Sequence, residues 1–348
     1  MRATTAVLSL WERVLRATGR TMQRATVARK TRSHTTASHK ITGARADPAS
    51  VRWALVALGV ALAQGALAQT VVETREVLAA ERTEAWAMRY MSAATHFSGF
   101  GVAVAQEPGS VRFGVELGHV PHVSTERRRV GLNGTKIEDL NKSPLFGRVR
   151  AWIGLPADLT LELAWTPPLE VDGVRPHRMF GAALERPLWQ RGRWLGSLRL
   201  AHRRGEVHGD ITCSRATAAE PAFSPGNPFG CRAPSRDRFR DHSTGLEIGS
   251  AWALADGRTQ AFASYAQVRA DLSTQVDAEL SATFDRSRLD HRGWLRTASI
   301  GLQAQPRADW EWLAALQWTP LEVRRGDDLQ ARDDDLWSLR VMVRRRVR

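Results

Sequence analysis

The chain lacks any long apolar segment after residue 69, where no run approaches the 18 or so residues of a membrane-spanning helix. Cysteine is also scarce. Cys213 and Cys231 are 18 positions apart with no clustered histidine, which does not match the ligand spacing of zinc sites. The sequence contains no phosphate-binding loop and no dinucleotide-binding glycine motif. We therefore expect no helical membrane span, no metal site and no bound cofactor.

The chain is strongly basic, with a formal net charge of +14, which by itself would suggest a nucleic-acid partner. Residues 1–69 account for most of this charge, because they hold 11 of the 50 basic residues and only 2 of the 36 acidic ones. The remaining 39 basic and 34 acidic residues are nearly balanced. There the arginines alternate with apolar residues instead of clustering, so we expect no nucleic-acid partner.

An export signal is predicted near the N-terminus. Arg52 precedes the apolar run Trp53–Ala63, and Ala66-Leu67-Ala68 has the small-residue pattern of a cleavage site. These are the parts of a secretory signal peptide, which we place at residues 51–68. Residues 1–50 are rich in Arg, Ser, Thr and Ala, so they are either a transit-type segment or a leader upstream of the true start. We favour the second interpretation and exclude them from the fold prediction.

Apolar residues recur with a period of two from about residue 110 to the end of the chain, which is the pattern of half-buried β-strands. For example, Leu161, Leu163 and Trp165 alternate with Glu162 and Ala164. The predicted strands are 110–123, 147–155, 159–167, 178–188, 194–208, 243–254, 259–273, 293–304, 310–320 and 336–347.

The connections between these strands alternate in length. Short turns are predicted at 156–158, 190–193, 255–258 and 305–309, and long connections at 124–146, 168–177, 209–242, 274–292 and 321–335. Short periplasmic turns opposite long extracellular loops are typical of outer-membrane barrels. We therefore predict an all-β fold, an antiparallel up-and-down transmembrane β-barrel over residues 109–348. An exported chain meets an oxidising environment, so we expect a disulfide between Cys213 and Cys231.

Residues 69–108 allow two interpretations. Trp86, Met88 and Tyr90 fit one alternating segment, and the stretch 100–104 fits another, so the region could add one more hairpin. The barrel would then have 12 strands instead of 10, and both numbers are even, as single-chain bacterial barrels require. The alternative is a helix that lies against or inside the barrel. We favour 12 strands.

Tryptophan is placed unevenly along the predicted strands. Of the 13 tryptophans, 11 lie after residue 69, and most of these stand at strand ends. The tryptophans at strand ends are Trp189, Trp194, Trp252, Trp310 and Trp312 beside the short turns, and Trp165, Trp294, Trp318 and Trp337 beside the long connections. Indole rings favour the boundary between an apolar core and water, so two such bands predict the aromatic girdles of a membrane barrel. Core tryptophans of a soluble β-sandwich would fall mid-strand as often as at strand ends.

With this signal peptide, alternation, girdle and loop asymmetry, the chain resembles bacterial outer-membrane β-barrel proteins over about 280 residues. The resemblance implies the bacterial outer membrane as the location. It implies outer-membrane lipid, lipopolysaccharide and the barrel-insertion machinery as partners, and it implies no oligomeric state. The chain departs from the pattern in its last strand, which ends Arg344-Arg345-Arg346-Val347-Arg348 without the terminal aromatic residue that the insertion machinery reads.

The residues expected to point into the barrel carry charges of both signs. A barrel of 10–12 strands has an interior that side chains nearly fill. Because unpaired buried charges are costly, facing charges of opposite sign should pair. The predicted lumen charge network comprises Arg112, Glu116, Arg148, Arg150, Glu162, Glu185, Arg199, Glu247, Arg269 and Arg340.

The favoured function is a structural or surface-binding role for a barrel with a largely filled, salt-bridged lumen. The first alternative is a narrow channel or transporter for small anionic solutes, lined by the same arginines. The second is an outer-membrane rim hydrolase, since the pairs Asp241-His242 and Asp290-His291 fall near the long-loop end and such a pair can polarise a base. No hydrolase motif matches at several positions, so we predict no enzymatic activity and no catalytic residue.

Overall fold

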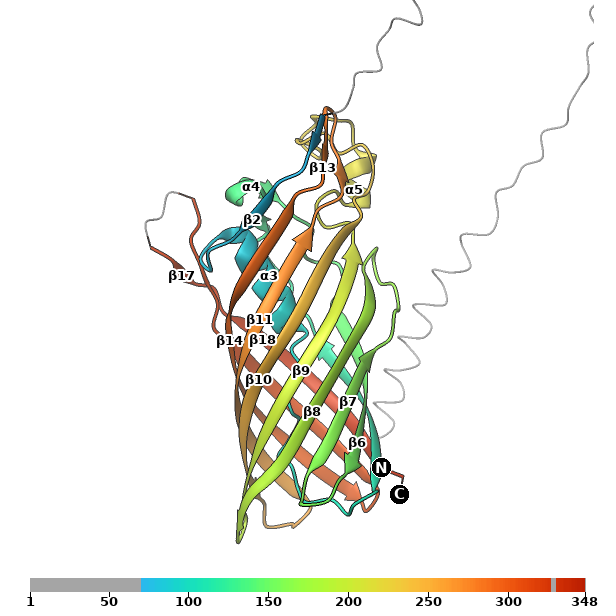
Figure 1. The fold of residues 1–348 in the computed structure, drawn as a ribbon, viewed down its shortest axis with the longest axis vertical. Helices are drawn as coiled ribbons and strands as arrows, with labels where there is room; N and C mark the ends of the chain where they lie inside the picture. The colour runs from blue at the N-terminus through green and yellow to red at the C-terminus, as the bar shows by residue number, and fades with distance from the viewer. Residues whose placement is uncertain (1–69, 327–329, 348) are drawn as a thin grey trace, which may run out of the picture. The chain divides into compact units, whose positions relative to one another are not determined.

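The computed structural model describes residues 70–326 and 330–347, so the predicted leader and signal peptide lie outside the described residues. Ten antiparallel strands form a closed barrel in which each strand pairs with its neighbours along the chain and the last pairs with the first (Figure 1). They are β3 (Val111–His119), β6 (Leu145–Gly154), β7 (Thr160–Thr166), β8 (Arg175–Arg191), β9 (Trp194–Gly209), β10 (Asp237–Ala253), β11 (Thr259–Gln275), β14 (Arg288–Arg307), β15 (Trp310–Thr319) and β18 (Leu336–Arg346). The predicted up-and-down barrel is confirmed, and all ten predicted segments are barrel strands. The preference for 12 strands is wrong.

The remaining short elements belong to the N-terminal segment and to the long connections. One extra strand, β2 (Arg75–Val77), pairs in parallel with the first residues of β14. The others are β1 (Thr70–Val72), β4 (Arg129–Val130), α4 (Gly131–Gly134), β5 (Lys136–Ile137), α5 (Arg215–Ala219), β12 (Ala278–Glu279), β13 (Thr283–Asp285), β16 (Glu322–Val323) and β17 (Arg332–Asp333).

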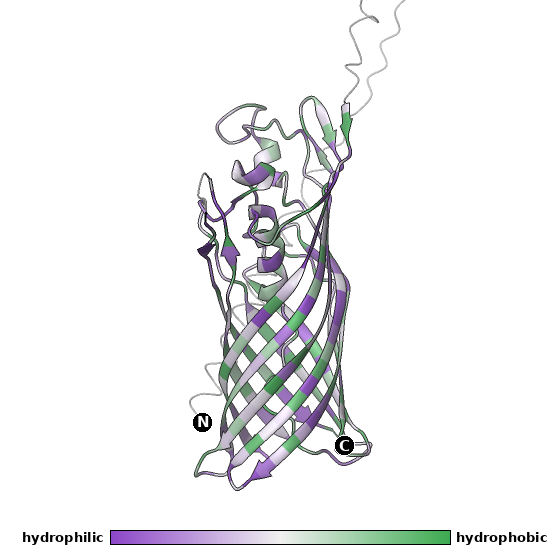
Figure 2. Cartoon of the chain, turned by 60° about the vertical axis from the view of Figure 1, so that its left-hand side comes forward, coloured by the Kyte–Doolittle hydropathy of each residue, from purple (hydrophilic) through white to green (hydrophobic). Residues whose placement is uncertain are grey.

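The segment predicted as an extra hairpin is instead a helix, α3 (Thr83–Ala94), which lies in the long-loop end of the barrel (Figures 1 and 2). Its apolar and small residues occupy every side of the helix, and most are buried, as expected for a helix enclosed by other elements. The spacing of Trp86 and Tyr90 misled the period-two interpretation, because residues four apart also share one helix face, and these two rings stack at 5.5 Å. Among the described residues, no helix is long and apolar enough to cross a membrane.

After α3 the chain runs without regular structure from Thr95 to Gln106, passes through the barrel interior and turns into β3. We call residues 92–102 the plug segment, because they lie inside the barrel and are mostly buried. Within the described residues 70–108, the helix alternative is therefore the correct one.

The two faces of the barrel wall differ in polarity, as the alternation predicts. Along β7, lumen-facing Thr160 and Glu162 are fully buried, while Leu163 and Trp165 are exposed on the outside. Exposed apolar side chains on the other strands, such as Ile248, continue this outer face as an apolar belt. An exposed apolar surface that surrounds a closed barrel is favourable in lipid and is typical of outer-membrane barrels.

All nine tryptophans predicted for the girdle lie on the outer face of the wall. Beside the short turns, Trp194 and Trp252 meet edge to face at 4.5 Å between ring centroids. Beside the long connections, Trp318 and Trp337 lie 6.2 Å apart. The apolar belt lies between the two bands.

Several strands are longer than a membrane crossing requires. A tilted transmembrane strand needs about 9–11 residues, whereas β14 has 20 and β11 has 17. The surplus lies at the long-loop end, where the outer face becomes charged and Asp271 pairs with Arg292 at 2.9 Å. The barrel therefore continues beyond the apolar belt on this side.

The disulfide between Cys213 and Cys231 is present, as predicted. Both cysteines are buried, in a small cluster with Val276 and Ala278. Within the same connection, the side chain of Ser214 accepts a hydrogen bond from the Thr217 amide and so caps α5. The long connection between β9 and β10 is thus an ordered structure.

Candidate functional site

The barrel interior contains a central group of ion pairs and two smaller groups beside it, which together we call the lumen network. Its centre is Glu116 on β3, whose carboxylate contacts Arg150 at 2.5 Å, Arg340 at 3.2 Å and Arg148 at 3.4 Å. All four side chains are at most 3% exposed. They meet because β18, β3 and β6 are adjacent strands and every second residue of each points inward.

A second carboxylate extends the lumen network across the barrel. Glu162 on β7 accepts from Arg150 at 2.6 Å and from Arg199 at 3.0 Å, so it bridges two guanidinium groups. Arg199 on β9 also contacts Glu185 at 3.0 Å and Glu247 at 3.2 Å. Each carboxylate thus shares its charge with a guanidinium from another strand.

Two smaller groups of charges lie on either side of this centre. Toward the short turns, Glu311 binds both Arg344 and Arg112, the latter at 2.9 Å. Toward the long loops, Arg203 pairs with Asp241. With these five, the lumen network contains seven arginines and six carboxylates among the described residues, namely Arg112, Glu116, Arg148, Arg150, Glu162, Glu185, Arg199, Arg203, Asp241, Glu247, Glu311, Arg340 and Arg344.

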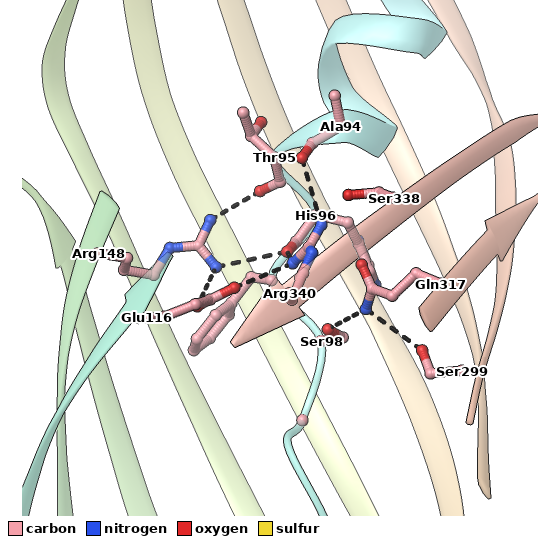
Figure 3. Close-up of polar contacts among 12 residues, drawn as sticks. Ala94, Thr95, His96, Ser98, Glu116, Arg148, Ser299, Gln317, Ser338 and Arg340 are labelled. Atoms are coloured by element: carbon pink, nitrogen blue, oxygen red, sulfur yellow. Dashed lines mark hydrogen bonds and ion pairs between the residues drawn. The ribbon is translucent and has the colours of Figure 1, made fainter. Parts of the chain in front are cut away.

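The arginines also hold the plug segment by its main chain, and Figure 3 shows the contacts of Arg148 and Arg340. Arg148 donates to the Thr95 carbonyl at 2.7 Å, Arg150 to the Ser98 carbonyl at 2.9 Å and Arg199 to the Phe97 carbonyl at 2.9 Å. Arg340 donates to the His96 carbonyl, and Arg203 to the Thr95 carbonyl. A chain without regular structure leaves its buried carbonyls unpaired, and these guanidiniums satisfy them.

The end of α3 contributes a favourable electrostatic term. Arg340 lies 3.4 Å and 3.3 Å from the carbonyl oxygens of Ala93 and Ala94, the last residues of the helix. A helix C-terminus carries a partial negative charge and so favours a nearby cation. The carbonyls and the helix end together offset the one arginine that the carboxylates leave in excess.

Side-chain contacts also hold the plug segment in place. The ring of Phe97 faces three guanidiniums, with that of Arg199 nearest at 4.3 Å from the ring centroid. Gln317 on β15 donates to Ser98 and, at 3.2 Å, to Ser299 (Figure 3). The amide of Gly99 donates to Glu247 at 2.7 Å.

The structure places nine of the ten residues predicted for the lumen charge network inside the barrel, in the contacts given above. Arg269 is the exception: it is exposed on the outer face of β11, directly opposite Trp294 of β14. The lumen face of this strand is instead apolar, because Val268, Ala270 and Leu272 pack against α3. Where a buried helix covers the inner wall, the lumen-facing residues are apolar, so a charged residue in the strand does not identify the lumen face.

The two Asp-His pairs are each divided by the strand. Asp241 faces the lumen and binds Arg203, whereas His242 is exposed on the outer face. His291 is buried toward α3 with its ring nitrogen 3.1 Å from the Leu78 carbonyl, while Asp290 binds Arg75 and Arg288 outside. Adjacent strand residues point to opposite faces, so neither pair has the geometry of an oriented base.

Sequence reasoning missed the plug segment as a partner of the arginines. The small residues of the plug segment could have indicated its position. A chain that crosses a filled lumen must approach other groups closely, and small residues allow this. At Gly99, an added Cβ would lie 3.2–3.3 Å from atoms of Arg199 and Glu247. Gly101 has φ +81°, which favours glycine, and an added Cβ there would lie 2.4 Å from the Gln303 side-chain oxygen.

No family model and no curated protein matches the chain. Solved structures similar to it are bacterial outer-membrane proteins. The outer membrane protease OmpT from Escherichia coli is 6% identical, with a TM-score of 0.34 over 69% of this chain and 94% of its own. A FadL homologue from Pseudomonas aeruginosa is 12% identical, with a TM-score of 0.32 over 78% and 76%. Ail, the attachment invasion locus protein of Yersinia pestis, is 9% identical, with a TM-score of 0.25 over 69% and 100%.

These likenesses concern the fold alone. The chain's own surface determines where it resides, since a closed barrel with an apolar belt between two tryptophan bands satisfies every condition for crossing lipid with strands. The chain is therefore an outer-membrane β-barrel protein.

Proposed function

We propose that the protein is a sealed, non-conducting barrel whose role is structural or surface-binding and is exerted from its long-loop end. The observation that carries this proposal is the attachment of the plug segment by five arginines of the lumen network to consecutive main-chain carbonyls. A segment bound in this way occupies the cross-section that a solute would need.

The charge balance of the lumen favours the same conclusion over an anion conduit. Every arginine of the lumen network lies within ion-pair distance of a carboxylate, so no row of free guanidiniums is offered to a passing anion. Displacing the plug segment would also leave buried guanidiniums without the carbonyl acceptors that it supplies, and a hydrogen bond to a charged group contributes about 1.5–3 kcal/mol. Transient opening by thermal motion should therefore be rare.

The long-loop end has features suited to a surface role. The strands extend past the apolar belt, and the connection that holds Cys213–Cys231 is ordered by its disulfide and by hydrogen bonds of the buried Asn227. Ordered projections lose little entropy on binding a partner, which favours recognition. The hydrolase alternative has no comparable support, because both Asp-His pairs are divided between the two faces of the wall.

Conductance in planar lipid bilayers tests the proposal. The wild-type protein should show no conductance steps at high salt, whereas Arg150→Ala/Arg199→Ala should raise the frequency of openings, because it releases the Ser98 and Phe97 carbonyls. The matched control is Arg269→Ala, the same change on the outer face, which should stay closed. Steady anion-selective conductance of the wild type would refute the sealed barrel and favour the channel alternative.

A further inference from the structure

A cavity of about 230 Å³ lies between α3 and the upper barrel wall, outside the lumen network. Its lining is largely apolar and includes Met91 and Ala94 from α3, Phe146 from β6, Met179 from β8 and Phe239 from β10. For scale, an engineered apolar cavity of about 150 Å³ in another protein binds benzene. The cavity here is large enough for a short alkyl chain.

The wall beside this cavity is interrupted. β7 ends at Thr166 because Pro167 and Pro168 follow, and proline cannot donate to a strand ladder. The last β6–β7 pair is Val149 with Trp165, so residues 145–148 of β6 extend beyond the described β7 pairing. β8 likewise continues past its last β7 pair, at Met179, to Arg175.

The width of the resulting gap limits what can pass. Neighbouring strands lie about 4.8 Å apart, so two strand spacings, about 9.5 Å, separate β6 and β8 where β7 is missing. That distance between two backbones admits one extended chain but not a lipid with two acyl chains side by side.

The cavity reaches both faces of the wall through this gap. Phe146 and Thr166 point into the barrel, whereas Leu145 and Gly147 belong to the outer face of β6, yet all four line the same cavity. Leu145 is 49% exposed. The girdle residue Trp165 directly precedes Thr166, so the opening lies at the membrane boundary on the long-loop side.

One polar atom in the cavity has no partner. The Thr166 hydroxyl oxygen is buried, and no hydrogen bond reaches it within the described part of the chain. The charged side chains at the cavity are already paired, since Lys142 binds Asp139 at 2.8 Å and Asp210 at 3.0 Å. A ligand with one uncharged hydrogen-bonding group would satisfy the hydroxyl, whereas a charged group would lack a counter-ion.

We propose that this cavity binds a free medium-chain alkyl compound with a single uncharged polar group, of the alkanol class, and that the compound enters through the gap between β6 and β8. The alkyl chain occupies the apolar space, and its hydroxyl pairs with that of Thr166. This assignment names the class of ligand for the proposed surface-binding role, and it rests on that role. If the lumen is sealed, a compound in the cavity cannot pass through the barrel, so the cavity is a binding site.

Photoaffinity labelling tests the proposal on the protein reconstituted in phosphatidylcholine vesicles. The probe is a 1-octanol analogue with a diazirine on its chain, and peptide mapping locates the labelled residues. We expect saturable labelling of 90–95, 145–147 and 166–179 that unlabelled 1-octanol suppresses. Non-saturable labelling spread over belt residues such as Ile248 would overturn the site.

Two variants sharpen this test, each checked for folding by heat-modifiable gel migration. Gly147→Leu should abolish saturable labelling by blocking the gap, since the nearest atom to an added Cβ is a Leu117 methyl at 3.5 Å and the backbone tolerates it. The control Ala263→Leu, on the outer face of β11, should label as wild type. Wild-type labelling of Gly147→Leu would contradict access through the gap.

Thr166→Val keeps the shape of the side chain and removes the hydroxyl. Competition by 1-octanol should weaken about two- to tenfold in this variant, the factor for one lost hydrogen bond, while competition by octane stays unchanged. Equal weakening of both would refute the role of Thr166. Labelling by a diazirine phospholipid in place of the alkanol would overturn the assignment to a free compound.

Conductance separates this proposal from the proposed function. A conducting wild type with saturable cavity labelling would refute only the seal and leave the site in place. A closed wild type without cavity labelling would refute only the ligand site.

Discussion

Neutralising Glu116 should destabilise the barrel more than neutralising Glu247, another carboxylate of the lumen network. Glu116 is the carboxylate that Arg148 and Arg340 contact, and it also binds Arg150, which retains Glu162. Glu116→Gln would leave two buried guanidiniums with main-chain carbonyls as their remaining acceptors. Removing one partner of a buried ion pair costs about 3–5 kcal/mol, and we expect a loss of unfolding free energy in that range.

The assay is urea-induced unfolding in lipid vesicles, followed by tryptophan fluorescence. Glu247→Gln is the matched variant inside the lumen, and it should cost less because Arg199 retains Glu162 and Glu185. Asp271→Asn breaks an ion pair exposed on the outer face and should cost at most about 1 kcal/mol. If Glu116→Gln fell within error of Asp271→Asn, the interpretation of the lumen network as the structural centre would be wrong.

Three further predictions concern other parts of the molecule. Reduction of Cys213–Cys231 should expose the connection between β9 and β10 to protease, seen as new cleavage within 210–236 by mass spectrometry, while the barrel keeps its heat-modifiable migration. Ile248→Arg, in the apolar belt, should cost about 2–4 kcal/mol of unfolding free energy in vesicles, whereas His242→Arg on the same strand above the belt should cost less than 1 kcal/mol or so. Burial raises the pKa of Glu138, in the connection between β3 and β6, from 4.5 to about 7, so the folded state binds the proton of this carboxyl more tightly than the unfolded state does. The free energy of unfolding should therefore fall as the pH rises from 4.5 to about 7. Urea titrations at several pH values should show this fall in the wild type and not in Glu138→Gln.

The strands could be predicted from the sequence because membrane and lumen impose opposite polarities on alternate residues. Predicted and observed bounds agree closely at the short-turn ends, as at Trp194 and Trp310, where tight turns interrupt the pattern. They diverge at the long-loop ends: β10 begins at Asp237, not near residue 243, and β14 at Arg288, not near 293. There the strands rise into water on the outside, so the alternation that lipid enforces is lost.

The charged centre was predictable for a related reason, since a charged residue in an alternating strand marks the lumen wherever lipid covers the other face. Arg150 and Glu162 follow this rule, and Arg269 breaks it because α3 makes the lumen side of β11 apolar. The helix itself could not be distinguished from a strand, because its buried residues show neither clear period. Tertiary enclosure, which no local pattern encodes, decides its structure.

The plug segment and the cavity have Thr95 in common. Thr95 lines the cavity, and its carbonyl accepts from both Arg148 and Arg203. The lumen network therefore fixes a residue that lines the cavity, and the contacts that hold the plug segment also border the cavity. A barrel that used this space for passage would need a mobile residue there, whereas two buried guanidiniums on one carbonyl make it one of the most tightly held points of the plug segment. This arrangement suits a site that retains a ligand taken from the membrane boundary.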